Sequence, residues 1–306
     1  MDSKQTTNHL LMVRPAHFAF NEETAGSNAF QQRSGGDAAN SLQQQAVEEF
    51  DAYVDLLRRN GVEVTVVQDT AEPFTPDSIF PNNCFSTHHD AMGRRLVVYP
   101  MFAPNRRKER EKLRHALRMM AFDKVVDLTH WEAEGRFLEG TGSLILDRDH
   151  HIAYACRSPR THEDVVREWA GEMGYDYFLF DSVDDNGTAV YHTNVVMHVG
   201  TNVAIVCLDS IRDDGQRKRL LSILDANGKE VVDITMAQMH LFAGNMLEVH
   251  NNHGEQLLVM SNTARMSLTE QQTSILTRDT RIVAPDIHTI ETVGGGSARC
   301  MIAEIF

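Results

Sequence analysis

Cysteine is scarce in this 306-residue sequence, and its cysteines are far apart. The four positions are Cys84, Cys156, Cys207 and Cys300. No CxxC pair occurs that could bind a metal or act as a redox pair, and the spacing offers no disulfide framework. The pattern predicts free thiols in a reducing compartment, and we expect a cytoplasmic protein.

Long apolar runs and excess positive charge are also missing. No stretch reaches the roughly 18 apolar residues that a membrane span needs, and the N-terminus lacks the basic region and apolar core of a signal peptide. The 43 Asp and Glu residues outnumber the 29 Lys and Arg residues, giving a net charge of −14. Nucleic acids and anionic membranes attract basic surfaces. We therefore expect a small-molecule partner, with neither nucleic acid nor membrane, and leave a homodimer open.

What the sequence does contain is a unit that recurs about every 50 to 60 residues. An apolar hairpin is followed by an amphipathic helix and then by an apolar strand. The clearest copy runs from 142 to 181, where Thr161 predicts the N-cap of the helix and Gly174 its C-terminal stop. The hairpins are expected over 84–99, 143–156, 194–207 and 245–260, the helices over 106–121, 161–173, 209–227 and 269–278, and the following strands over 124–128, 177–180, 231–234 and 281–285.

A partial fifth copy begins the chain, with a strand at 11–14, a helix over 38–60 and a strand at 62–67. Five units that bury their apolar faces against neighbours favour a closed ring. The last strand, 301–305, has no unit of its own and is free to pair with the first strand. The alternative is an open doubly wound sheet, which expects single strands between helices rather than hairpins.

The segment 25–40 is rich in Gly, Ser, Gln and Asn, which is typical of a mobile loop. It is either a flap over the site or an uninvolved surface loop.

The strongest local signal for chemistry is the run Gly294-Gly295-Gly296 followed closely by Cys300. Three glycines predict a loop that lets the backbone approach a ligand. A cysteine just beyond it is a candidate nucleophile, and a buried structural cysteine is the alternative. A cysteine nucleophile needs a proton shuttle and an orienting acid. His192 and Glu139 each precede a hairpin in equivalent places of two other units, so a closed ring would bring all three groups together.

With these residues in order, the chain resembles the superfamily of arginine deiminases, dimethylargininases and amidinotransferases, called penteins. The resemblance covers essentially the whole chain. It rests on Asp77-Ser78-Ile79-Phe80 (D-x-x-F), the basic turn Pro104–Glu109, Phe137-Leu138-Glu139-Gly140 (E-G-G-D), Ser158-Pro159-Arg160-Thr161 (S-x-R-T), His192-Thr193-Asn194 (H-x-D) and the Gly-rich segment that ends at Cys300.

The resemblance implies a single α/β catalytic domain over 1–306, built as a five-bladed ββαβ propeller with pseudo-fivefold symmetry. It also implies that Cys300 attacks a guanidino or ureido carbon and that His192 moves the protons. Glu139 would orient His192. Arg160, together with Arg106 or Arg107, would hold a substrate carboxylate, because the guanidinium fork matches it. No metal or organic cofactor is implied. Adjacent histidines, His88-His89 and His150-His151, lack a third ligand.

The sequence departs from the pattern where deiminases grip the guanidinium cation with acids. Asn82 and Asn83 follow Asp77, Asn194 stands in the H-x-D position and Gly142 ends the E-G-G-D segment. Asparagine can donate to a ureido oxygen, which a carboxylate cannot. We therefore expect a hydrolase of citrulline, or of arginine through citrulline to ornithine. An amidinotransferase with the same nucleophile and a non-enzymatic pentein binding protein are the alternatives.

Overall fold

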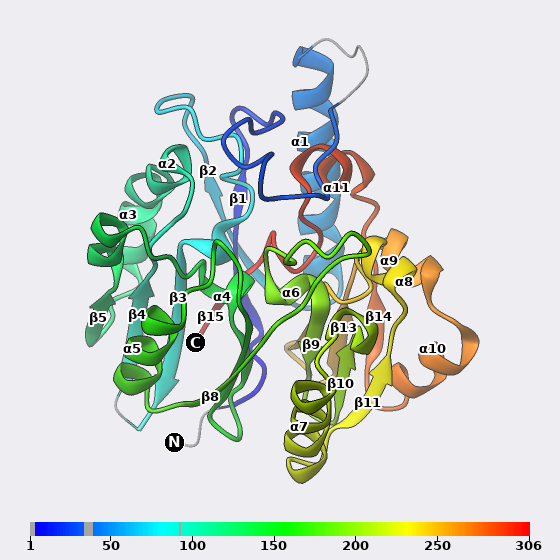
Figure 1. The fold of residues 1–306 in the computed structure, drawn as a ribbon. Helices are drawn as coiled ribbons and strands as arrows, with labels where there is room; N and C mark the ends of the chain where they lie inside the picture. The colour runs from blue at the N-terminus through cyan, green and yellow to red at the C-terminus, as the bar shows by residue number, and fades with distance from the viewer. Residues whose placement is uncertain (1–3, 34–38, 92) are drawn as a thin grey trace.

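The computed structural model describes residues 4–33, 39–91 and 93–306, which form an α/β fold with five three-stranded sheets (Figure 1). The sheets are β15-β1-β2, β3-β4-β5, β6-β7-β8, β11-β10-β9 and β12-β13-β14. Their strands are β1 (His9–Arg14), β2 (Glu63–Gln68), β3 (Phe85–Asp90), β4 (Gly93–Val98), β5 (Lys124–Asp127), β6 (Ile145–Asp147), β7 (Ile152–Cys156), β8 (Asp176–Phe180), β9 (Met197–Val199), β10 (Val203–Val206), β11 (Glu230–Asp233), β12 (Leu247–His250), β13 (Gln256–Val259), β14 (Arg281–Val283) and β15 (Ala303–Ile305).

Every sheet has the same internal order. Two strands pair antiparallel as a hairpin, and the strand after the helix joins the second of them in parallel. In the first sheet β15 supplies the missing hairpin strand: it pairs antiparallel with β1, with Leu11 opposite Ala303. The predicted pairing of the last strand with the first is confirmed. It explains how Cys300, close to the end of the sequence, reaches residues from earlier units.

The helices fall into two groups. Longer helices follow the hairpins and lie toward the outside of the fold, whereas single turns such as α4 and α6 lie near its middle (Figure 1). The helices are α1 (Ala39–Arg59), α2 (Pro104–Arg107), α3 (Glu109–Met119), α4 (Gly140–Ser143), α5 (Glu163–Met173), α6 (Thr193–Val196), α7 (Asp214–Ala226), α8 (Met236–His240), α9 (Asn262–Ser267), α10 (Glu270–Leu276) and α11 (His288–Gly294), with 3-10 turns η1 (Pro81–Asn83), η2 (Thr129–Glu134) and η3 (Leu208–Ser210).

The predicted order of hairpin, helix and strand is confirmed in each unit, but several boundaries are wrong. The hairpins predicted at 143–156 and 194–207 begin too early: Ser143 belongs to the helical turn α4, and residues 194–196 belong to the helical turn α6. Thr161 is not the N-cap of α5, because the side chain of His162 accepts the N–H of Asp164. The predicted stop is right: Gly174 adopts the left-handed conformation with φ of 71°. The first residue of the helix predicted over 38–60 lies outside the described residues.

Apolar side chains from neighbouring units share common clusters, which fixes the units against one another. In one cluster, Phe180 and Val206 from two sheets pack with Leu258 from a third. In another, Leu10 and Val249 pack with Met301, just after Cys300. Among the helices of the described residues, none combines the length and apolar character that crossing a bilayer requires.

Candidate active site

A small buried cavity brings the candidate nucleophile and base together. Both Cys300 and His192 line it, and they keep only 3% and 2% of their surfaces exposed. The other lining residues are Asn28, Asp77, Phe80, Asn83, Arg106, Arg160, Tyr191 and Gly294–Gly296. A larger groove, between α3 and the sheet β3-β4-β5, is lined by Cys84 but by no histidine. Cys300 therefore lines the same cavity as a histidine, which is the arrangement that a cysteine nucleophile needs.

Glu139 lies behind His192 and is completely buried. Its Oε2 is 2.8 Å from His192 Nε2, and its Oε1 accepts the backbone N–H of Phe102 at 3.0 Å. Burial by itself raises the pKa of Glu139, but the charge of Arg160 and the hydrogen bond with His192 outweigh it and hold that pKa below its usual range. The carboxylate is therefore ionised at neutral pH.

The ionised carboxylate fixes the proton on the imidazole ring. Burial lowers the pKa of His192 to about 4, against the opposing effect of Glu139, so the ring is neutral at pH 7. A carboxylate can only accept, so Nε2–H of His192 donates to Glu139 and Nδ1 is left without a proton. Nδ1 is then the atom able to take a proton from a reacting group.

Two amides surround the sulfur of Cys300. Asn194 donates its Nδ2 hydrogen to Sγ at 3.4 Å and Asn245 donates its own at 3.2 Å. Asn194 was predicted as a substrate-binding residue from the H-x-D position, and its Oδ1 is buried without a hydrogen-bond partner in the described residues. The side chain of Asn194 thus contacts the sulfur through one atom and leaves the other unpaired.

Arg160 is buried among groups from three parts of the chain. Its Nη1 lies 3.4 Å from Glu139 Oε2, and its Nη2 donates to Ser27 Oγ at 2.7 Å. The guanidinium lies over the ring of Tyr191, with 4.9 Å between Cζ and the ring centre. Arg160 lines the cavity, as a carboxylate-binding residue should.

Arg106 and Arg107, predicted as alternatives for the same role, are placed differently. Arg106 lines the cavity, but it already pairs with Glu109 (Nε to Oε1, 2.8 Å) and donates to Asn83 Oδ1 at 2.7 Å. Arg107 is not among the lining residues; its Nε donates to the carbonyl of Met101 at 2.9 Å. Of the predicted pair, only Arg106 reaches the cavity, and there it orients Asn83.

The ligand-facing side of the cavity holds polar atoms that the described protein does not pair. Asp77 Oδ1 and Asn83 Nδ2 are buried without hydrogen-bond partners in the described residues, and both residues line the cavity. Burial raises the pKa of Asp77, while Arg106 opposes that effect. Both side-chain atoms of Asn82 are likewise unpaired, but Asn82 does not line the cavity. Unpaired buried groups cost free energy and are typical of a site awaiting a ligand.

Gly142 is necessary at its position. A Cβ built there would lie 2.4 Å from Asn83 Nδ2 and 2.8 Å from His192 Nδ1. No acid fits between these two groups without displacing them. Packing against Asn83 and His192 therefore requires glycine at the position where the E-G-G-D motif has its acid.

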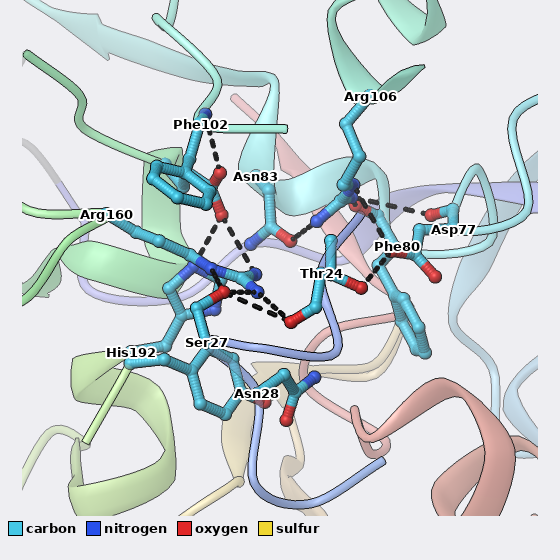
Figure 2. A network of polar contacts seen from close by, with 12 residues as sticks. Thr24, Ser27, Asn28, Asp77, Phe80, Asn83, Phe102, Arg106, Arg160 and His192 are labelled. Atoms are coloured by element: carbon cyan, nitrogen blue, oxygen red, sulfur yellow. Dashed lines mark hydrogen bonds and ion pairs between the residues drawn. The ribbon is translucent and has the colours of Figure 1, made fainter. Parts of the chain in front are cut away.

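Sequence reasoning missed Asn245, and it left open whether the segment 25–40 covers the site. Asn245 starts the fourth hairpin, in a place equivalent to those of Glu139 and His192, and that equivalence was the available signal. Residues 25–33 of the predicted loop lie over the Gly-rich segment: Asn28 donates to the carbonyl of Gly295 at 3.3 Å and Ser27 holds Arg160. Residues 34–38 of that loop lie outside the described residues. Figure 2 shows the contacts of Arg160 with Thr24 and Ser27.

Metal-binding geometry does not occur in the described ranges 4–33, 39–91 and 93–306, where no group of three or more His, Cys, Asp or Glu side chains could hold an ion. All four cysteines are free.

Residues 14–306 match the profile of the family described as N,N dimethylarginine dimethylhydrolase, eukaryotic. The chain belongs to this family. It is therefore a member of the pentein superfamily of arginine-modifying hydrolases, as the motifs indicated. A comparison with curated proteins finds no match.

Solved structures share the fold at low sequence identity. The N-terminal domain of ArgZ bound to substrate, an arginine dihydrolase from the ornithine–ammonia cycle in cyanobacteria, is 16% identical with a TM-score of 0.74, and 97% of each chain is covered. AgrE in complex with L-arginine is 17% identical with a TM-score of 0.76, covering 97% of this chain and 40% of AgrE. A dimethylarginine dimethylaminohydrolase adduct with S-methyl-L-thiocitrulline is 16% identical, with a TM-score of 0.67 and coverage of 97% and 99%.

Proposed function

We propose that this protein is a cysteine-dependent hydrolase that cleaves the C–N bond of a ureido or guanidino group on an arginine-like amino acid, with citrulline the favoured substrate. The observation that carries the proposal is the convergence of Cys300 and His192 on one cavity, with ionised Glu139 behind the imidazole. Family membership supports a hydrolase of arginine-like compounds. We also propose that the five sheets close into a five-bladed propeller and that residues 1–306 act as one catalytic domain.

The reaction would proceed through a covalent adduct. His192, neutral before the reaction, first takes the proton of the Cys300 thiol at Nδ1. The thiolate so formed attacks the ureido carbon and makes a sulfur–carbon bond, and the carbon–nitrogen bond to the departing amine breaks as His192 passes that proton to the nitrogen. Water then attacks the adduct while neutral His192 takes a proton from it, and the sulfur–carbon bond breaks. Glu139 stabilises the cationic imidazolium that forms in between, since the two are 2.8 Å apart.

The preference for a ureido group rests on the orientation of Asn83. Arg106 has only hydrogen-bond donors, so the oxygen of the Asn83 amide must face Arg106 and its Nδ2 must face the cavity. That donor needs an acceptor, which the ureido oxygen supplies and a guanidinium cannot. The unpaired acceptor atoms, Asp77 Oδ1 and Asn194 Oδ1, suit the N–H groups that a ureido group also carries.

The amino-acid end of the substrate would be held by Arg160. It lines the cavity, and its guanidinium is buried, so a carboxylate bound there would form a strong charge-assisted pair. Ser27 and the carbonyl of Thr24 already occupy some of its donors, so a bound carboxylate would share or replace these contacts.

The test is product analysis of the purified protein with citrulline, arginine and dimethylarginine, measuring ammonia, ornithine and methylamines. We expect ornithine from citrulline, and loss of turnover in Cys300→Ser but not in Cys207→Ser, a matched variant outside the cavity. Fast release of dimethylamine from dimethylarginine with no attack on citrulline would contradict the ureido preference. Amidino transfer, the alternative, would appear as a new guanidino product when a primary amine is added to the same assay with arginine.

A further inference from the structure

We infer that Asn245 is a positioning residue that donates a fixed hydrogen bond to the sulfur of Cys300 and stabilises the negative charge that the sulfur carries when it reacts, through an amide whose orientation the surrounding backbone locks. The inference rests on the proposed role of Cys300 as nucleophile. Asn245 lies in the unit that begins with the hairpin predicted over 245–260, where no motif indicated a functional residue.

The amide of Asn245 is paired on both of its ends. Its Oδ1 accepts the backbone N–H of Arg299 at 3.0 Å, and its Nδ2 donates to the carbonyl of Asn194 at 2.9 Å and to Cys300 Sγ at 3.2 Å. A backbone N–H can only donate and a carbonyl can only accept, so a flipped amide would lose both backbone contacts. The N–H that faces the sulfur is therefore fixed before any substrate binds.

Asn194, the second amide at the sulfur, lacks this lock. Its Nδ2 is 3.4 Å from Sγ, while its Oδ1 has no hydrogen-bond partner in the described part of the chain. Asn194 is thus able to turn its oxygen toward a ligand, whereas Asn245 is held in place. The two amides therefore differ in role: Asn245 donates to the sulfur of the nucleophile, and Asn194 is available to bind the substrate.

The fold places Asn245 by a close backbone approach. A Cβ at the preceding Gly244 would lie 2.2 Å from the carbonyl oxygen of Val195, so only glycine lets this loop reach α6. Asn245 itself is fully buried and does not line the cavity. It therefore acts through the sulfur and not on the substrate.

The physical effect is stabilisation of the charged form of the sulfur. A hydrogen bond donated to an anion favours that anion over its protonated form, and more strongly where water is excluded. Only 3% of the Cys300 surface is exposed, so water has little access to the sulfur and a hydrogen-bond donor from the protein counts for more. The fixed N–H of Asn245 supplies that donor.

The experiment measures the rate at which iodoacetamide alkylates Cys300 as a function of pH, by peptide mass mapping, in the wild-type chain and in Asn245→Asp. The variant is isosteric, and its carboxylate can still accept from the N–H of Arg299, but it faces the sulfur with an acceptor. We expect the pH of half-maximal alkylation to rise by about one unit or more, and the rate at pH 7 to fall about tenfold. Asn186→Asp, an exposed loop change of the same charge, should match the wild type.

An unchanged alkylation profile in folded Asn245→Asp would overturn the inference. If that variant does not fold, Asn245→Ser replaces it with the same expectation, because its hydroxyl is too short to reach the sulfur. Alkylation needs no substrate, so this result stands apart from the test of the proposed function. In turnover, a positioning role predicts a lower kcat with KM within about twofold. A raised KM at constant kcat would contradict it.

Discussion

The two sides of the cavity differ in how fully their polar atoms are paired. On the side of His192, both oxygens of Glu139 are engaged, by the imidazole and Arg160 on one and by a backbone N–H on the other. On the opposite side, Asp77 and Asn83 each keep a buried atom without a partner in the described residues. In the proposed function, the paired side serves proton transfer and the unpaired side binds the substrate.

Glu139→Gln tests the paired side most severely. The neutral amide would leave Arg160 without its charge partner and remove the stabilisation of cationic His192. We expect kcat to fall by about 10³ to 10⁴ while KM changes little, as when the orienting acid of a triad is neutralised. Steady-state kinetics with citrulline measure this. A loss smaller than tenfold would mean that Glu139 is not the orienting acid.

Acid should destabilise the fold through the same buried groups. Burial lowers the pKa of His192 to about 4 and that of His198 to about 3, so each binds its proton first in the unfolded chain, and stability falls as the pH drops from about 6.5 toward 4. The loss from His192 alone is about 3 kcal/mol. Glu139, whose pKa is depressed, adds to it below about pH 4.5.

Urea unfolding at a series of pH values measures this loss. His198→Asn should make the free energy of unfolding depend less on pH, and His253→Asn, at an exposed position, should leave that pH dependence unchanged. A free energy of unfolding that stays constant between pH 6.5 and 4 would show that the imidazoles are not held neutral.

Asn83→Asp tests the unpaired side. It replaces the donor that faces the cavity by an acceptor, so a ureido oxygen would meet a carboxylate instead of an N–H. We expect kcat/KM for citrulline to fall by about 10- to 100-fold and that for arginine to fall less or to rise. The ratio of the two values is the measurement. An equal loss with both substrates would show that Asn83 does not read the ureido oxygen.

Arg107→Ala should have the smallest effect. Its side chain donates to the carbonyls of Met101 and Phe102 and lies outside the cavity lining. We expect kcat/KM to stay within about threefold and stability to fall by about 1 kcal/mol. Arg160→Ala, by comparison, should raise KM strongly. If Arg107→Ala raised KM as much, the carboxylate would have to bind at the other end of the cavity.

Much of this organisation was predictable from the sequence. Hairpins leave an alternating pattern and outer helices leave a 3.6-residue pattern, so the five units and the pairing of β15 with β1 followed from the periodicity. The motif positions then brought Cys300, His192 and Glu139 together. The turns α4 and α6 were missed because four residues are too few to show a helical period.

The details that decide chemistry depend on contacts between distant residues. Arg106 and Arg107 are neighbours in one helical turn and point in different directions, so the sequence left both as candidates. The free donor of Asn83 is known only once Arg106 is seen to occupy its oxygen. Asn245 belongs to none of the motifs, and its contact with the sulfur of Cys300, 55 residues away, is visible only in the fold.

The measurement that tests the central claim most directly is a crystal structure of Cys300→Ala with citrulline bound. We predict the ureido carbon beside residue 300 and His192 Nδ1, its oxygen at Asn83 Nδ2, and the carboxylate at Arg160. Citrulline bound outside this cavity, or bound in it with the ureido group turned away from residue 300, would contradict the account.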